Sequence, residues 1–119
     1  MRAPAGLGPA GKRLWKSIDD VFDFEDEPGK VQVLREACKV ADIIAELDEA
    51  ADEAPLTVRG SMGQPVISPF IAEARVQRAL LAQLLGRLGL PDNDEPGDGA
   101  SRRTRAARTA AKARWNQNQ

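Results

Sequence analysis

The chain has 119 residues, of which 42% are hydrophobic and 29% are charged, a composition that suits one small domain. It contains no histidine and a single cysteine, Cys38, which excludes a histidine-based catalytic triad, a zinc site built from histidines or several thiolates, and an intrachain disulfide. The 17 basic and 18 acidic residues almost cancel, so the total charge gives no indication of a nucleic-acid partner.

These absences set the functional expectations. We expect a protein that is not an enzyme and that uses no cofactor and no metal. The N-terminal stretch lacks the apolar core of a signal peptide, and no segment approaches the roughly 20 apolar residues that cross a membrane. We therefore expect a soluble intracellular protein that is not secreted and has no membrane partner, with Cys38 buried among apolar helical positions.

Residues 1–8 are rich in Gly, Pro and Ala, which predicts a flexible leader. A helix is expected from Pro9 through "PAGKRLWKSIDDVFDF", because proline suits the first helical position and the apolar residues recur at helical spacing. Three basic residues stand near its start, where the helix dipole disfavours cations. They are Lys12, Arg13 and Lys16. We interpret them as solvated surface side chains, and the mismatch leaves an anionic partner as the alternative.

A second, long helix is expected from Pro28 to about Ala54. Its polar residues share one arc of roughly 120°, which predicts the solvent face. They are Gln32, Arg35, Glu36, Lys39, Asp42 and Glu46. The opposite apolar arc is near 180°, wider than one core-facing stripe needs, so this helix has room for two packing partners. That arc consists of Val31, Val33, Leu34, Cys38, Val40, Ala41, Ile44 and Leu47.

The segment "APLTVRGSMGQPVISPF" differs in kind from its neighbours. Val58 and the pair at 66–67 are strand-like, and Gly60 to Gly63 supply turn residues between them, which predicts a short hairpin. Two strands alone are only marginally stable, so the hairpin should pack against helices or a neighbouring subunit.

A third helix is expected after this hairpin. Ser68 supplies a capping hydroxyl and Pro69 the first helical residue, while Gly89 and Pro91 mark the end. Its apolar residues share one broad face, which Val76 and Leu80 extend sideways. The other members of that face are Phe70, Ile71, Ala74, Leu81, Leu84, Leu85 and Leu88.

The two longer helices carry more apolar surface than a three-helix monomer hides, and a domain of about 80 residues has a limited core. We therefore expect a homo-oligomer such as a ring, and an unusually tight monomer is the alternative. The predicted interface consists of Val33, Val40, Ile44, Leu47, Val76, Leu80 and Leu84. The expected fold is mainly α: about three helices with a short β-hairpin before the last, self-associating over 9–91, followed by a flexible basic tail.

Charge is unevenly distributed along the chain. Residues 1–101 carry 11 basic and 18 acidic residues, net −7, whereas 102–119 carry six basic residues and no acidic one. We expect 92–101 to be an acidic flexible linker and 102–119 a basic tail that binds the phosphate backbone of DNA. The predicted DNA-binding residues are Arg102, Arg103, Arg105, Arg108, Lys112 and Arg114, with Lys12, Arg13 and Lys16. Two alternatives are a solubilising tail and a peptide that docks on an acidic protein.

Three segments within 7–91 occur in a telling order and spacing: "GPAGKRLWKSI", "VLREACKVADIIAEL" and "VRGSMGQPVISPFIAEARVQRALLAQLLGRLGL". The most specific part is a Gly-x-x-Gly-Gln turn at 60–64 followed by a proline-led helix that ends in "RLGLP". Together they resemble a phage terminase small subunit, of the short type found in tailed phages of actinobacteria. Members often have Asn or His before the helix-opening proline, where this chain has Ser68.

The resemblance implies a ring-forming, non-catalytic subunit of a bacteriophage genome-packaging motor, acting in virion assembly in the cytoplasm of the infected bacterial host. Such a subunit binds double-stranded viral DNA and recruits or regulates the large terminase subunit, which carries the ATPase and nuclease. The chain agrees in lacking a G-x-x-x-x-G-K-[ST] phosphate loop.

The resemblance assigns no DNA-binding residue, and a separate N-terminal helix-turn-helix is not evident. DNA contact therefore falls to the basic residues named above, or to a channel lined by arginines such as Arg59, Arg75 or Arg78. The rival hypothesis is a protein-interaction adaptor whose basic tail docks on an acidic protein without binding DNA.

Overall fold

A computed structural model describes residues 1–90 and shows a mainly helical fold with a two-stranded hairpin before the last helix, as predicted. The predictions for 92–101 and 102–119 lie outside the described residues. The elements are α1 (Pro9–Asp19), α2 (Pro28–Glu53), β1 (Thr57–Arg59), β2 (Pro65–Ile67) and α3 (Pro69–Arg87).

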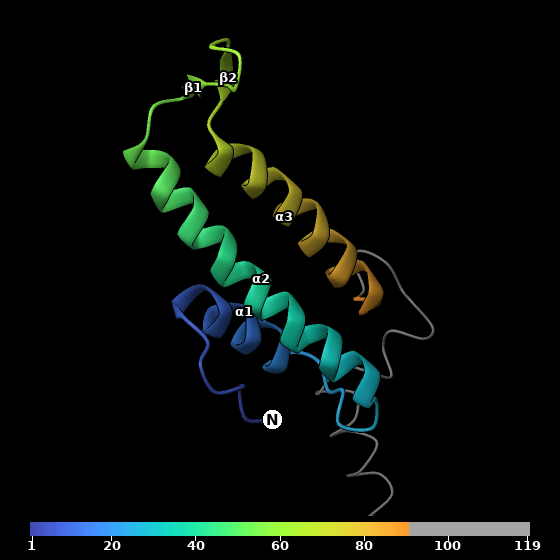
Figure 1. The fold of residues 1–119 in the computed structure, drawn as a ribbon. Coiled ribbons are helices and arrows are strands. Elements are labelled where there is room, and N and C mark those ends of the chain that lie inside the picture. Colours follow the sequence, from blue (N-terminus) through green and yellow to red (C-terminus); the bar gives the residue numbers. More distant parts are fainter. Residues whose placement is uncertain (91–119) are drawn as a thin grey trace, which may run out of the picture.

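The long helix α2 is the central element, and it contacts both α1 and α3 (Figure 1). Helix α3 runs back along α2 in the opposite direction. The antiparallel hairpin that connects them stands beyond the helix ends, with Val58 paired to Val66. The N-terminus lies near α1, at the other end of the molecule from the hairpin.

Proline occupies one of the first two positions of all three helices, where its missing N–H has no intrahelical partner to lose. Helix α1 is shorter than predicted, because it ends at Asp19 and does not continue through residue 24. The apolar residues after Asp19 belong to a loop. Phe24 is 1% exposed and packs into the core from this loop, and its ring stacks on that of Phe22.

The N-terminal segment differs from the flexible leader that its composition predicts. Leu7 is buried in the main core cluster, and Met1 packs against that cluster. The N-terminal ammonium group lies 3.2 Å from the Asp19 carboxylate. One apolar side chain and one ion pair therefore hold a segment that looks like a linker by composition.

Both ends of α3 lie where the sequence places them. Gly89 has a φ of +65°, the left-handed conformation of a helix-terminating glycine, and Leu90 packs against the core just after it. At the other end Ser68 is the N-cap residue, but its hydroxyl does not cap the helix. The Ser68 Oγ is buried and makes no hydrogen bond with any described residue.

The main core lies where α1, the first half of α2 and the end of α3 meet. Its buried members are Leu7, Trp15, Ile18, Phe24, Leu34, Cys38 and Leu88. Further along α2, the layer between α2 and α3 is thinner, with Val40, Ile44 and Ala74 buried. The hairpin end of the molecule consequently has little core of its own.

Candidate nucleic-acid and self-association surfaces

The three basic residues predicted on the first helix are all solvent-exposed on α1. Lys12 and Arg13 lie in the first half of α1, whereas Lys16 lies in its last turn because the helix ends at Asp19. Lys16 forms a surface ion pair with Asp20, 3.2 Å between Nζ and Oδ2. A surface pair of this kind contributes little energy, so the three side chains remain available to a polyanion.

The anion that the dipole of α1 requires is supplied by the chain itself. The Asp42 carboxylate, from α2, accepts hydrogen bonds from the backbone N–H groups of Gly8 and Gly11, each 2.7 Å long. The sequence places Asp42 on the solvent arc of α2, and this prediction is wrong because the side chain is half-buried against α1. The start of α1 therefore does not by itself require an external anionic partner.

The two glycines make this contact sterically possible. A Cβ atom on Gly11 would lie 2.5 Å from Asp42 Oδ2 and 2.7 Å from the carbonyl oxygen of Cys38. A Cβ atom on Gly8 would lie 2.9 Å from Asp42 Oδ1. The "GPAG" stretch thus joins a helix start to a carboxylate on the neighbouring helix, a role that its turn-like composition does not reveal.

Only part of the predicted self-association interface is accessible in the single chain. Val40 and Ile44 are buried, and Val33 is half-buried against the main core. Val76 is 60% and Leu80 39% exposed, and Leu47 and Leu84 are half-buried.

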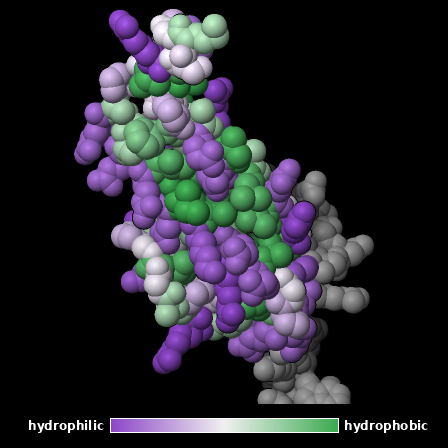
Figure 2. All heavy atoms as spheres, viewed as in Figure 1, coloured by the Kyte–Doolittle hydropathy of each residue, from purple (hydrophilic) through white to green (hydrophobic). Residues whose placement is uncertain are grey.

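Ile43, which the sequence analysis did not single out, is 42% exposed one turn before Leu47 on α2. Figure 2 shows apolar side chains gathered over α2 and α3. We call the exposed and half-buried apolar residues on these two helices the helical face: Ile43, Leu47, Val76, Leu80 and Leu84. An exposed apolar band of this extent on a small domain is typical of an interaction surface.

The turn of the hairpin owes its shape to Gly60, Gly63 and Gln64. The Gly60 N–H donates to the Gln64 carbonyl oxygen at 2.7 Å, and Gly63 has a φ of +79°. The Gln64 side chain folds back over Gly60, where a Cβ atom would lie 2.6 Å from Gln64 Nε2, and its Oε1 accepts from the Met62 N–H at 3.0 Å. These contacts explain why the turn has glycine at 60 and 63 and glutamine at 64.

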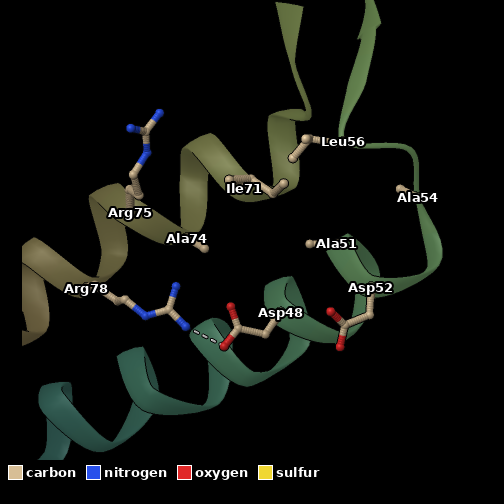
Figure 3. Close-up of a pocket in the computed structure, with 9 residues that line it drawn as sticks. All are labelled: Asp48, Ala51, Asp52, Ala54, Leu56, Ile71, Ala74, Arg75 and Arg78. Atoms are coloured by element: carbon tan, nitrogen blue, oxygen red, sulfur yellow. Dashed lines mark hydrogen bonds and ion pairs between the residues drawn. The ribbon is translucent and has the colours of Figure 1, made fainter.

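A cleft of about 540 Å³ lies between α2 and α3 beside the hairpin (Figure 3). Arg78 points across it to Asp48, 2.5 Å away, whereas Arg75 points away from the α2 carboxylates. Ala51 and Ala74 face each other between the helices and let them approach closely. All three channel candidates, Arg59, Arg75 and Arg78, are therefore exposed, and Arg78 is ion-paired within the chain.

Cys38 is fully buried in the core, as predicted. Burial raises the pKa of its thiol from 9.0 to about 11, and the nearby Asp42 carboxylate adds to the shift. A thiol in this state is a poor nucleophile at neutral pH. Within residues 1–90, no group of three or more metal-ligating side chains occurs.

The raised pKa predicts a loss of stability at alkaline pH. The neutral thiol is favoured in the folded state, so stability is intact below pH 9.0 and falls as the pH rises toward about 11. Between about pH 8 and about pH 10 the free energy of unfolding should fall by about 1 kcal/mol more in the unmodified protein than in Cys38→Ala. Urea unfolding of both proteins at the two pH values measures the difference. An equal fall in both proteins would contradict the prediction.

The six basic residues of 102–114 predicted to bind DNA lie outside the described residues. In 1–90, no helix is long and apolar enough to cross a membrane. Comparison with known proteins found no matching family model, curated protein or solved structure. The chemistry of the surfaces themselves therefore carries the functional argument.

Proposed function

We propose that this chain is a self-associating, non-catalytic DNA-binding subunit, of the terminase small-subunit type, in a bacteriophage DNA-packaging machine. The observation that carries the proposal is the segregation of charge: six basic residues and no acidic one in 102–119, behind a body of net charge −7. Such a segment is electrostatically complementary to a polyphosphate, whereas the acidic remainder of the chain is not.

Two further observations support the proposal. The helical face leaves apolar side chains of α2 and α3 exposed to a partner, as expected of a subunit that assembles into a ring. The three segments within 7–91 resemble terminase small subunits, which supports placing the chain in a DNA-packaging machine. In that machine, the ring would present double-stranded viral DNA to the large ATPase and nuclease subunit, in the cytoplasm of the infected host.

The proposal is tested with the full chain in two measurements. Light scattering at micromolar concentration should give the mass of an oligomer, which is at least twice the chain mass of 12.9 kDa. Duplex DNA should bind the same sample, and binding should weaken in a variant with four basic residues changed to glutamine: Arg102, Arg105, Arg108 and Lys112.

A matched control removes the same charge from exposed positions within 1–90: Arg2, Arg35, Lys39 and Arg87, each changed to glutamine. The control should bind DNA almost as well as the unmodified chain. A protein that binds a purified large subunit or another acidic protein but no DNA would instead support the adaptor hypothesis. A 12.9 kDa species would refute the assembly.

A further inference from the structure

The described residues carry two separate exposed apolar surfaces. One is the helical face on α2 and α3. The other is on the hairpin and its base, which we call the hairpin patch: Leu56, Met62 and Ile67, exposed by 68%, 89% and 39%. In Figure 1 the hairpin projects past the helix ends, so the hairpin patch and the middle of the helical face lie on different parts of the molecule.

The hairpin tip is organised to present Met62. Its N–H is held by Gln64 Oε1 at 3.0 Å, and the Gly63 N–H donates to the Gly60 carbonyl oxygen at 3.0 Å. Because the turn is already formed, docking the tip requires little further loss of backbone entropy. A methionine side chain adapts its shape to an apolar surface and is common in binding sites of this kind.

The hairpin also carries a charge that two carboxylates beside the helical face can pair with. Between Glu53 and Glu73 the chain has one charged residue, Arg59, which is exposed on β1. Exposed residues of both signs border the helical face: Glu46 lies one turn from Ile43 and Glu73 one turn from Val76, while Lys39 and Arg87 lie one turn from Ile43 and Leu84. A docked hairpin can place Arg59 beside one of the two carboxylates.

We propose that the hairpin patch of one copy docks on the helical face of the next copy, with Met62 seated among its apolar side chains. This inference rests on the self-association in the proposed function and specifies its geometry. Such a contact is heterologous, joining unlike surfaces, and it covers both apolar surfaces of every chain when the assembly closes. A two-fold pairing of helical faces would leave each hairpin patch in water.

The test is a complementation experiment with two full-length variants. Met62→Lys removes the docking side chain but keeps the helical face, whereas Leu80→Lys keeps the hairpin but puts a charge on the face. Each variant alone should fall to monomer at concentrations where the unmodified chain is assembled, because losing a buried methionine or leucine weakens the contact at least about tenfold. Mixed together, the two should form a one-to-one dimer and nothing larger.

Far-UV circular dichroism checks that each variant folds, and Ile43→Lys replaces Leu80→Lys if the latter does not. Val21→Lys is the matched control, since Val21 is 50% exposed and belongs to neither surface. It should assemble like the unmodified chain.

The outcomes separate the inference from the proposal on which it rests. Assembly that survives Met62→Lys overturns the hairpin contact and leaves self-association standing. Two monomeric variants that stay monomeric when mixed also overturn it, because an intact hairpin and an intact helical face would then be present together without pairing. A monomeric unmodified chain overturns self-association, and the hairpin contact with it.

Discussion

Alanine at position 11 should destabilise the protein by about 2–3 kcal/mol, although alanine is the better helix former by about 1 kcal/mol. The added Cβ would sit 2.5 Å from Asp42 Oδ2 and 2.7 Å from the Cys38 carbonyl oxygen. The oxygen of Cys38 belongs to the backbone of α2 and cannot turn aside, so α1 must move away. That movement lengthens or breaks the hydrogen bonds that Asp42 accepts from Gly8 and Gly11.

Two other helical glycines provide the control for Gly11→Ala. A Cβ atom at Gly29 or Gly86 would have no neighbour within 4 Å. Gly29→Ala and Gly86→Ala should therefore leave stability unchanged or raise it by about 0.5–1 kcal/mol. Urea unfolding followed by circular dichroism compares all three variants. If Gly11→Ala unfolds at the same urea concentration as Gly86→Ala, the close approach of α1 to α2 does not exist in solution.

Affinity for duplex DNA should fall by roughly a thousandfold when salt rises from about 50 mM to about 200 mM, if all six basic residues of 102–114 contact phosphates. Each neutralised phosphate releases condensed counterions, so six contacts give a slope of about −5 in log affinity against log salt. Fluorescence anisotropy of a labelled duplex, repeated at several salt concentrations, measures this slope per chain.

The four-residue variant of this segment, with glutamine at 102, 105, 108 and 112, should flatten the slope to about −2, because only two basic residues remain there. The control with the same charge removed from 1–90 should keep a slope near −5. If the slope flattens equally in both variants, net charge alone drives binding. A slope that flattens only when Lys12, Arg13 and Lys16 are changed to glutamine would move the DNA contact to α1.

Much of the fold could be predicted from the sequence because its signals are local. Proline at the helix starts, glycine after α3 and the turn residues at 60–63 each act through the backbone of their own neighbourhood. Asp42 could not be placed in this way. Its position in the pattern of α2 is that of a solvent-facing residue, and only the packing of α1 brings two N–H groups to it.

The candidate surfaces, too, could be predicted from the sequence only in part. The apolar excess of α2 and α3 is visible in the helical pattern, but the pattern cannot divide it between core and surface. Val40 and Ile44 become core because α3 lies along that side of α2, which leaves Ile43 exposed on the next flank. Leu7 and Phe24 both lie outside the helices and still fill the core, which the pattern of a helix does not predict.

The antiparallel course of α3 also sets the distance between the hairpin and Leu90. The hairpin marks one end of the molecule, and Leu90, where the described chain ends, packs at the other, against the core that α1 closes. The 19 residues of α3 separate the two ends by about 28 Å at the standard rise of 1.5 Å per residue. The helices thus hold the hairpin and Leu90 about that far apart. A matched insertion of seven residues in α2 and α3 would lengthen that distance by about 10 Å.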